Sequence, residues 1–237
     1  GFIMHDIYKL FGLSARLIIP ALLFSTAVKA ETVNCTAITS LPATIDTQGV
    51  FCLTQNVATA ISSGLAIEIT ANNVLLDLNG WKVGGQAAGS ATTATGIFSD
   101  ANNVTIQNGI VRGFSKGIHL TGRGATVRSV LADQNTTRGI LVEGQGTVVE
   151  DNQIVHTGNS TTGANIQARA IEVQGTDSVI KNNIVSGLTA TGTATEFGII
   201  FTSTADNSTA RSNIVSGDKI GTGNSYGIYM ASNTDAV

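Results

Sequence analysis

A small residue followed by isoleucine recurs along the chain, and each copy opens a short stretch of alternating apolar and polar positions. Such alternation is typical of a β-strand with one buried face. Successive copies begin 30, 21, 22, 31, 28 and 29 residues apart. The copies are Ala66–Ile67, Gly96–Ile97, Gly117–Ile118, Gly139–Ile140, Ala170–Ile171, Gly198–Ile199 and Gly227–Ile228. The pattern therefore predicts one type of strand that is repeated about seven times.

Two further apolar positions follow each of these strands at nearly fixed distances. Ten residues after the small residue come Leu76, Ile106, Val127, Val149, Ile180 and Val237. The copy at Gly198 breaks this rule, and Ala210 fits there if its turn is two residues longer. Four or five residues later come Trp81, Ile110, Leu131, Ile154, Ile184 and Ile214. A fixed internal register with a variable total length predicts coils of three strands, with insertions in one turn.

The repeated unit is a coil of strands rather than a pair of helices. Helical repeats would show an apolar stripe with a period of 3.6 residues, and leucine-rich repeats would show a long Leu pattern. Neither is present in the sequence. The architecture that remains is a parallel β-helix, in which equivalent strands of neighbouring coils pair about 4.8 Å apart. We therefore expect an all-β fold in which Ile118, Ile140, Ile171 and their equivalents fill a shared interior.

Composition agrees with a fold built from strands and turns. The chain has 237 residues, of which 12% are charged and 5% aromatic, with 27 Gly and only 2 Pro. A chain of this length can form one domain with a single core. Its net charge of -3 argues against a nucleic-acid partner, because a phosphate-binding protein needs a basic stripe.

The N-terminus has the pattern of an export signal. Lys9 and Arg16 precede the apolar stretch Leu17–Val28, which is too short to span a bilayer well and is broken by Pro20. We expect residues 1–30 to be a signal peptide that is cleaved after Ala30. The mature protein would then be secreted, periplasmic or at the cell surface, without a membrane segment. The alternative, a buried N-terminal helix, is disfavoured by the strand-like sequence that follows.

Cys35 and Cys52 lie just after this segment. In an exported chain an even pair at this spacing predicts a disulfide, which would contribute roughly 3 kcal/mol in the chain-entropy model. A metal or redox pair would need CxxC spacing or a nearby His, and the sequence has neither. We expect the bond to stabilise an N-terminal cap of residues 31–64, ahead of the β-helix of residues 65–237.

Two segments carry a resemblance to a known group of proteins. "ANNVLLDLNGWKVGG" (Ala71–Gly85) is similar to the first coil of many exported bacterial proteins, and "CTAITSLPATIDTQGVFCLTQN" (Cys35–Asn56) resembles their capping segment. From about Leu65 to Val237 the chain resembles the right-handed parallel β-helix proteins of the pectin-lyase-like superfamily. The resemblance implies that fold, and a groove of the kind that commonly takes acidic polysaccharides. Its motifs are specific for the fold and nearly silent on activity.

Four insertions occur at the same point of the coil, after a third strand and before the next first strand. They are Val83–Thr95, His156–Arg169, Ser186–Phe197 and Ser216–Tyr226. All four should emerge along one edge and form a wall beside the first strands. The short coils that begin at Gly96 and Gly117 should leave a gap in that wall. A groove bounded in this way can hold a linear polymer.

The residues that point outward from the first strands are the candidate site residues. The first outward column reads Glu68, Phe98, His119, Leu141, Glu172, Ile200 and Tyr229, and the second reads Thr70, Asp100, Thr121, Glu143, Gln174, Thr202 and Ala231. Opposite the gap, His119 lies diagonal to Asp100 and Glu143. An imidazole flanked by two carboxylates could transfer a proton or hold a cation. We therefore predict Asp100, His119 and Glu143 as catalytic residues.

Other residues of this face are predicted to contact a substrate. Phe98 and Tyr229 could stack on sugar rings, and Glu172 lies in the same outward column. The alternative for the whole face is an exposed sheet with solvated polar side chains. His156 stands alone in a Thr/Gly-rich insertion and is expected to be solvated.

Enzyme signatures of the similar proteins are mostly absent. An Asn-Thr-Asp, as in polygalacturonases, occurs only at Asn233–Asp235 and without its companion motifs. Asp100 and Glu143 with Arg123 only partly match a calcium-dependent pectate lyase. No zinc spacing, phosphate loop or nucleophile elbow occurs. We expect no metal site and no cofactor, except calcium if the protein is a lyase.

The sequence leaves two functions open. The resemblance implies an exported protein that binds or acts on an acidic polysaccharide along the first strands, as a lyase, epimerase or hydrolase. The missing motifs and the Thr/Asn/Gly-rich surface favour instead a non-catalytic surface or adhesive platform with a cell-surface partner. Neither the substrate nor the oligomeric state follows from the sequence. Gly227–Val237 stops where a second strand would begin, so we also expect a truncated piece of a longer protein.

Overall fold

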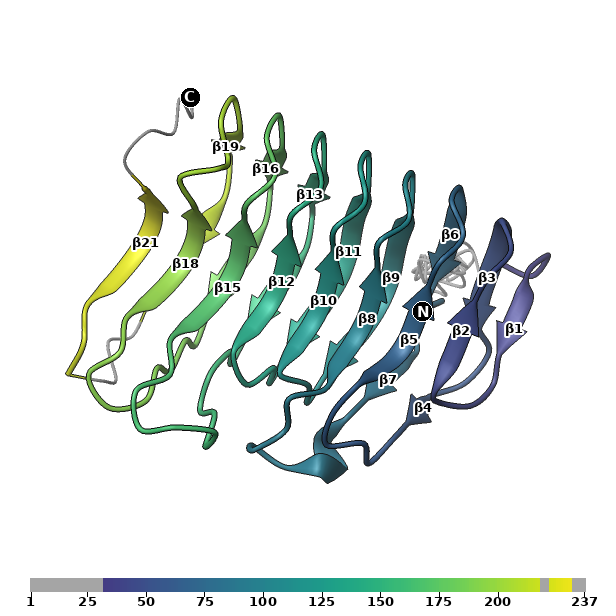
Figure 1. Ribbon diagram of the computed structural model, residues 1–237, viewed down its shortest axis with the longest axis horizontal. Coiled ribbons are helices and arrows are strands. Elements are labelled where there is room, and N and C mark those ends of the chain that lie inside the picture. The colour runs from purple at the N-terminus through teal and green to yellow at the C-terminus, as the bar shows by residue number, and fades with distance from the viewer. Residues whose placement is uncertain (1–31, 218–221, 232–237) are drawn as a thin grey trace, which may run out of the picture. The chain divides into compact units, whose positions relative to one another are not determined.

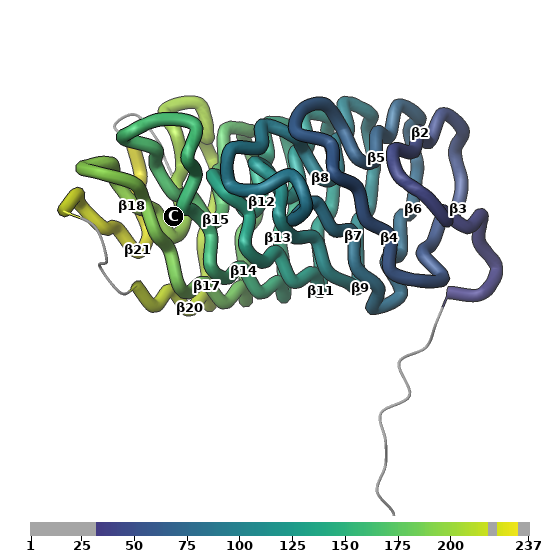
Figure 2. Tube along the Cα trace, turned by 90° about the horizontal axis from the view of Figure 1, so that it is seen from below, coloured from purple at the N-terminus to yellow at the C-terminus, as the bar shows by residue number. Residues whose placement is uncertain are grey.

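The computed structural model describes residues 32–217 and 222–231, and the predicted signal peptide lies outside this range. Within the range nearly all regular structure is β, and the strand pairing is parallel. The one helical element there is a short 3-10 turn, η1 (Gln86–Ala88). The coils follow one another along a single axis and contribute strands to the same sheets (Figure 1; Figure 2). This part of the chain is a parallel β-helix, as the repeat predicts.

One sheet collects the first strand of every coil, and we call it the first-strand sheet. Neighbours in the sheet pair at the residues that the repeat aligns, for example Ile97 with Ile118 and Ile118 with Ile140. The segment predicted as a cap contributes a strand of its own, so the sheet has eight strands rather than seven among the described residues. They are β2 (Ala43–Ile45), β5 (Leu65–Ile69), β8 (Thr95–Ser99), β10 (Lys116–Leu120), β12 (Arg138–Val142), β15 (Ala168–Val173), β18 (Glu196–Phe201) and β21 (Ser225–Met230).

The second and third strands of the coils share hydrogen bonds and form one larger sheet, because β9 and β11 run through both positions without a break. The second-strand path is β1 (Thr36–Ile38), β3 (Gly49–Leu53), β6 (Val74–Asp77), β9 (Thr105–Arg112), β11 (Thr126–Asp133), β13 (Val148–Glu150), β16 (Val179–Lys181) and β19 (Thr209–Arg211). The separate third strands are β4 (Val57–Ala58), β7 (Lys82–Gly84), β14 (Gln153–Val155), β17 (Ile184–Ser186) and β20 (Ile214–Val215).

The predicted register of the second strands is confirmed. Val127 pairs with Ile106 on one side and Val149 on the other. Ala210, which required a longer turn, pairs with Ile180. The predicted inward residues of the first strands are also buried, and each such side chain stabilises the fold by roughly 1.5–3 kcal/mol. Ile228 and Met230 of β21 are more exposed because no described strand pairs with the far side of β21.

The third strands lie one residue away from the expected register. Ile110, Leu131 and Ile184 were aligned with Ile154, but they share a column with Gln153. That column faces outward, and Ile184 and Ile214 are exposed. The core is filled by the next residue of each strand, as in Val111, Ala132, Ile154 and Val185. Most third strands carry two adjacent aliphatic residues, so alternation alone does not decide which one is buried.

Polar side chains link neighbouring coils at the corner between the second and third strands. Asn152 donates its amide to Asn183, and Asn183 donates to Asn213, each at 3.0 Å. Each also donates to a backbone carbonyl, as Asn183 does to Val149 at 2.9 Å. Asn152 and Asn183 are buried, so these bonds satisfy groups that would otherwise be costly to bury. The Asn repeat at this corner is therefore structural.

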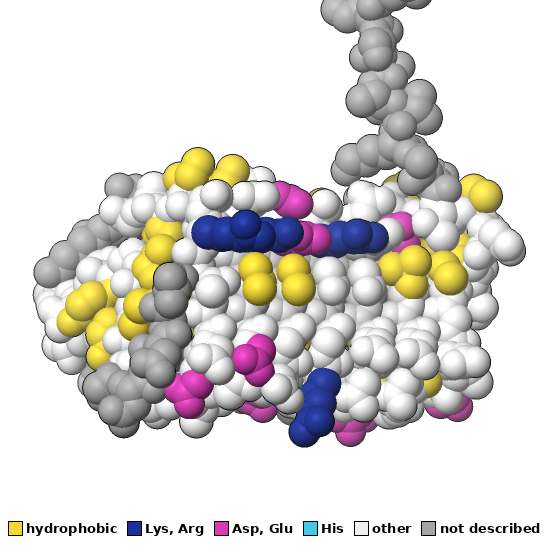
Figure 3. All heavy atoms as spheres, turned by 90° about the horizontal axis from the view of Figure 1, so that it is seen from above, with side chains coloured by type: hydrophobic (Ala, Val, Ile, Leu, Met, Phe, Trp, Pro, Cys, Tyr) yellow, Lys and Arg dark blue, Asp and Glu magenta, His cyan; other side chains and the backbone are white. Residues whose placement is uncertain are grey.

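The outer face of the second strands carries a row of basic and acidic side chains, visible in Figure 3 as a line of both colours. Lys181 lies 2.6 Å from Glu150, and Gln107 connects Arg128 with Asp77 through bonds of 2.6 and 2.7 Å. Burial raises the pKa of Asp77, but its hydrogen bonds outweigh burial and the net shift is downward. The row aligns the coils at a surface where single ion pairs contribute little.

The predicted disulfide between Cys35 and Cys52 is confirmed, and Cys52 is buried. It joins the segment before β1 to β3, the strand with which β1 pairs. Residues 43–58 then pair with β5, β6 and β7 as a complete coil. The disulfide thus fixes the first described strand to the first complete coil.

Candidate functional site

The long insertions emerge at one edge of the β-helix, where third strands lead into first strands (Figure 1; Figure 2). They are residues 85–94, 156–167, 187–195 and 216–224, of which 218–221 lie outside the described part. The connections 113–115 and 134–137 between them are short. The order of long and short turns is therefore as predicted, with two short turns between the first and second long ones.

The first-strand sheet places the predicted column in register. Phe98, His119, Leu141 and Glu172 occupy successive strands at paired positions, and the rings of Phe98 and His119 meet edge to face at 5.2 Å. The column is less open than an exposed sheet would be, because Leu141 and Glu172 are buried. Neighbouring side chains therefore cover its middle.

The structure brings His119 close to one of its two predicted partners. His119 Nε2 lies 3.3 Å from Glu143 Oε1, and Nε2 is buried without a hydrogen-bond partner among the described residues. Its side chain is 14% exposed, whereas that of Glu143 is 35% exposed. Asp100 is exposed, and no hydrogen bond or ion pair is found between it and His119 within the described chain. The close pair is thus a buried imidazole behind an accessible carboxylate.

The surroundings of His119 favour the neutral imidazole. Burial lowers the pKa of His119, the positive charges of Lys116 and Arg138 lower it further, and Glu143 only partly opposes them. A neutral imidazole can accept a proton, which an imidazolium cannot. The neutral imidazole of His119 and the carboxylate of Glu143 can therefore share one added proton. Lys116 and Arg138 are the cations near this pair.

A row of three cations runs beside this column, and the sequence predictions did not include it. Lys116, Arg138 and Arg169 pair across three successive strands. Each stands directly before the small residue of the repeated step, as in Lys116–Gly117–Ile118. A recurring cation before Gly-Ile or Ala-Ile was the signal that could have identified them. We call these three residues the basic row.

Glu172, predicted to contact a substrate, is bound by the basic row instead of facing solvent. Arg169 Nη1 lies 2.9 and 2.8 Å from its two oxygens, Arg138 Nε donates to it, and Gln174 donates at 3.0 Å. Burial raises the pKa of Glu172, but Arg138 and Arg169 outweigh burial and hold the pKa below its ordinary value. Glu172 therefore orients the two guanidinium groups, and one carboxylate balances only one of them.

A cavity of about 360 Å³ lies at this place. It is lined by Thr137, Arg138, Thr162, Asn165, Ile166, Gln167 and Arg169. Two of these are arginines of the basic row, and four belong to the insertion 156–167. The insertion and the start of two first strands thus enclose a positively charged hollow.

Aromatic side chains gather farther along the same sheet. Phe197 stacks on Tyr226 with ring centroids 5.6 Å apart, and Tyr229 meets these rings at 5.3 and 5.0 Å. Phe197 and Tyr226 occupy the same column as the basic row, in the next two strands. Tyr229, a predicted substrate contact, therefore belongs to an aromatic cluster that continues the basic row.

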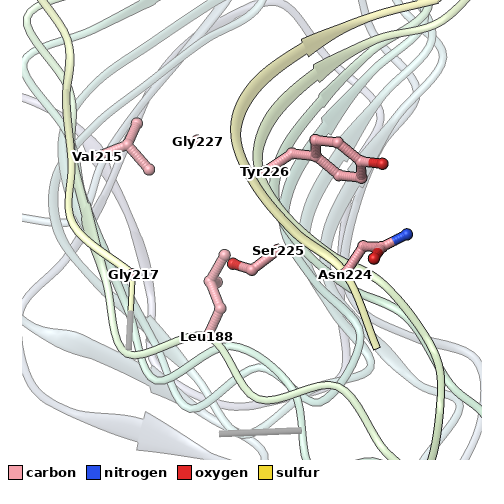
Figure 4. A pocket seen from close by; sticks show the side chains of 7 residues that line it. All are labelled: Leu188, Val215, Gly217, Asn224, Ser225, Tyr226 and Gly227. Atoms are coloured by element: carbon pink, nitrogen blue, oxygen red, sulfur yellow. The ribbon is translucent and has the colours of Figure 1, made fainter. Parts of the chain in front are cut away.

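Another cavity, about 520 Å³, lies at the last described coil. Figure 4 shows Val215 and Gly227 on opposite sides of it, with Tyr226 turned away on the outer face. Val215 continues the core column of Val185, so this cavity is a continuation of the apolar interior. Its lining gives it no catalytic or charged group.

The described parts of the chain contain no candidate metal site and no candidate membrane-spanning helix. No three His, Cys, Asp or Glu side chains there lie close enough together to hold a metal ion. Calcium needs six to eight oxygen ligands with several carboxylates, which the pair of Glu143 and His119 does not supply. Residues 32–217 and 222–231 also contain no helix that is long and apolar enough to cross a bilayer.

Known proteins resemble this chain in the architecture of their structures. No protein-family model matches the chain, and no curated protein matches its sequence. The tailspike protein (gp208) of Dettilon aligns with 83% of this chain, with a TM-score of 0.61 and 18% identity. This chain spans 38% of the length of that protein.

Two other solved structures align more loosely. The alginate lyase from Paenibacillus sp. str. FPU-7 aligns over 78% of this chain and 87% of its own length, with a TM-score of 0.46 and 15% identity. The mannuronan C-5 epimerase AlgE4 A-module of Azotobacter vinelandii aligns over 76% and 84%, with a TM-score of 0.25 and 10% identity. At such identities a likeness concerns the fold.

The handedness of the coil follows from the same observations. Parallel strands joined by a crossover within one sheet are almost always connected in the right-handed sense, and each first strand here returns to the same sheet one coil later. The tailspike aligns over most of this chain. The described residues therefore have a right-handed parallel β-helix fold, which is the fold that the sequence resemblance implies.

Proposed function

We propose that this chain is part of an exported protein that binds an acidic polysaccharide along the first-strand sheet. The observation that carries the proposal is the basic row, in which Lys116, Arg138 and Arg169 outnumber the one carboxylate, Glu172, that is bound to them. Guanidinium groups bind carboxylates through paired hydrogen bonds. A uronate unit would carry the carboxylate that this excess charge attracts.

The shape of the face supports a chain-like ligand. The hollow beside Arg138 and Arg169 is bounded by an insertion on one side, and the aromatic cluster of Phe197, Tyr226 and Tyr229 follows in the same direction. Aromatic rings present flat apolar surfaces with polar rims. Successive sugar units of one polysaccharide could therefore contact the basic row and then the aromatic cluster. Phe98 lies beyond the opposite end of the basic row.

The pair of Glu143 and His119 supplies the chemistry if the protein is an enzyme. In a lyase reaction Glu143 would take the proton from the carbon next to the uronate carboxyl. The electron pair of that bond would form a carbon–carbon double bond while the glycosidic C–O bond breaks, and the departing oxygen would take a proton from water. In an epimerase a proton would return to the opposite face of the same carbon. His119 would hold Glu143 in place, and Asp100, farther along the outward column, would contact the neighbouring sugar unit.

Export is supported by two features. Cys35 and Cys52 form a disulfide, and disulfides persist in oxidising compartments outside the cytoplasm. The sequence pattern of residues 1–30 predicts a signal peptide that ends near Ala30. The proposed location is therefore the periplasm, the cell surface or the medium.

The experiment is to incubate the mature chain with a panel of polyuronates, with and without calcium. Ultraviolet absorbance reports unsaturated product, and proton NMR reports epimerisation. Turnover that is lost in Glu143→Gln and reduced in His119→Gln supports an enzyme. Binding is measured in parallel, with Lys116→Gln as the test variant and Lys181→Gln, on the second-strand face, as the matched control. We expect Lys116→Gln to weaken polyuronate binding about fivefold, and equal binding by both variants would contradict the proposal.

A non-catalytic platform is the second candidate function. The buried Nε2 of His119 and the cover over Leu141 and Glu172 favour a surface that binds without turning over its ligand. The two candidates differ in one result of the same experiment. Polyuronate binding that depends on Lys116, without any product in the presence or absence of calcium, would select the platform.

A further inference from the structure

A second cavity, of about 410 Å³, lies in the gap between the first two long insertions. It is lined by Gln86, Gly89, Ser90, Gly113, Gln134, Thr136, His156, Gly158 and Asn159. Its volume lies within the range of small-molecule sites. His156, which the sequence predicts to be a solvated loop residue, is 68% exposed, and it also has one polar partner, Asp133.

His156 is held by a chain of polar side chains from three coils. Its Nδ1 lies 3.1 Å from Asp133 Oδ1, and Arg112 Nη2 lies 3.0 Å from the other oxygen of Asp133. The amide of Gln86, with its oxygen turned toward Arg112, accepts from Arg112 Nη2 at 3.0 Å. Asp133 is largely buried, with 12% of its side chain exposed.

This network leaves one ring nitrogen available. Since Asp133 accepts from Nδ1–H, the second nitrogen of the neutral imidazole, Nε2, carries a lone pair. The side chain of His156 is 68% exposed, and Nε2 has no hydrogen bond or ion pair within the described residues. The network thus presents a fixed acceptor at the cavity.

The backbone of His156 has a left-handed conformation, which glycine adopts more easily than other residues do. The corresponding turn residue is Gly113 with φ 81°, Gln134 with φ 52°, His156 with φ 51° and Gly187 with φ 68° in four successive coils. Left-handed backbone is costly for residues with a side chain. Of the three turn residues that line the cavity, Gln134 and His156 therefore carry side chains, whereas Gly113 and the next turn residue, Gly187, are glycines. Gly113 is also required for the cavity, because a Cβ there would lie 2.5 Å from the backbone of Gln86.

We propose that this cavity binds a neutral, hydroxyl-rich ligand of about one sugar unit, with a hydroxyl donating to His156 Nε2. The charge of the site decides the ligand class. Arg112 and Asp133, which do not line the cavity themselves, neutralise one another. Apart from His156, the polar side chains that line the cavity carry amides and hydroxyls. Such a lining favours hydroxyl groups over carboxylates, unlike the basic row on the first-strand sheet.

The test uses the chain labelled with ¹⁵N-histidine, whose imidazole signals are followed by NMR during titration with glucose, galactose, mannose and N-acetylglucosamine. His156→Gly assigns the signal by its loss, and glucuronate is the charged comparison. We expect a saturable shift of His156 Nε2 with at least one neutral sugar, no matching shift of His119, and weaker binding of glucuronate. Asp133→Ala should weaken the neutral sugar about tenfold, because it removes the acceptor of Nδ1–H and releases the imidazole.

Three results would overturn the proposal. They are the absence of a saturable His156 shift with every neutral sugar, a preference for glucuronate, and unchanged affinity in Asp133→Ala. Thr121→Ala, on the first-strand sheet, is the matched control and should leave the affinity unaltered. The proposal is independent of polyuronate binding at the basic row, so either can fail alone.

Discussion

Arg169 and Glu172 lie on the same strand, three residues apart, and the guanidinium Nη1 contacts both carboxylate oxygens at 2.9 and 2.8 Å. Arg138 reaches the same carboxylate from the preceding coil. Glu172 is 3% exposed, so a buried anion fixes two cations at the surface of the first-strand sheet. The stability of this cluster and the charge of the surface are therefore linked.

Glu172→Gln separates these two effects. The change leaves two guanidinium groups without their carboxylate, and we expect the free energy of unfolding in urea to fall by roughly 1–3 kcal/mol. Glu150→Gln, which breaks the more exposed pair with Lys181, should cost less than about 1 kcal/mol. Polyuronate binding should become tighter in Glu172→Gln, since its positive charges are no longer balanced. Equal stability loss in both variants would show that burial of Glu172 is unimportant.

Stability should depend on pH through His119 in a separate window. The pKa of native His119 lies below 6.5, so below pH 6.5 the unfolded chain takes up a proton that the native chain does not. This contribution to stability is fully present above pH 6.5 and is lost as the pH falls toward the native pKa. The lowered pKa values of Glu172 and Asp77 act only at more acidic pH, below about 4.5. Urea unfolding at a series of pH values measures both.

His119→Gln is the control for that series. Glutamine does not titrate, so the loss of stability between pH 6.5 and 5 should be smaller in the variant than in the parent chain. Thr121→Ala, on the same sheet, removes no titrating group and should leave the pH dependence in this window close to that of the parent. The assignment to His119 would be wrong if both variants gave the same curve.

Asn183 should be among the most sensitive polar positions of the core. It is fully buried, donates to Asn213 and to the carbonyl of Val149, and accepts from Asn152. Asn183→Ala leaves several of these groups without partners, and we expect a loss of roughly 3 kcal/mol or more in thermal or urea unfolding. Asn213→Ala, at the less buried end of the ladder, should cost clearly less. A reversed order would mean that the ladder contributes little.

His156→Gly should be nearly neutral for stability although it removes the proposed ligand acceptor. Glycine relieves the left-handed backbone, but it adds disorder to the unfolded chain and loses the contact with Asp133. We expect the free energy of unfolding to change by less than about 1 kcal/mol. Gly187→His, which places a side chain at the equivalent turn of the next coil, is the converse variant and should destabilise. A large loss in His156→Gly would mean that the residue is structural.

The coil could be predicted from the sequence because close backbone packing restricts residue type. A Cβ at Gly139 would lie 2.6 Å from the carbonyl oxygen of Ala170 in the next coil, and one at Gly96 would lie 2.6 Å from that of Gly117. Few side chains fit there, so a small residue recurs before each isoleucine. The ten-residue register follows because the turn between first and second strands keeps one length in most coils.

The site was harder to predict, since its contacts join residues of different coils. Asp133 and His156 are 23 residues apart in sequence, and nothing local distinguishes His156 from a solvated loop residue. The basic row carried a local signal, but its meaning depends on Glu172 being buried beneath it. Of the predicted catalytic residues, His119 and Glu143 lie together, whereas Asp100 stands apart, because a diagonal in the sheet does not fix where a long side chain points.

The insertions all enter at one corner of the coil, and this has a consequence for how such a surface can diversify. The pairing of neighbouring coils is set by the strands and by the Asn ladder, which lie away from that corner. Loops of any length can therefore be exchanged there without disturbing the stacking. Ligand preference could change coil by coil, with the scaffold left untouched by each exchange.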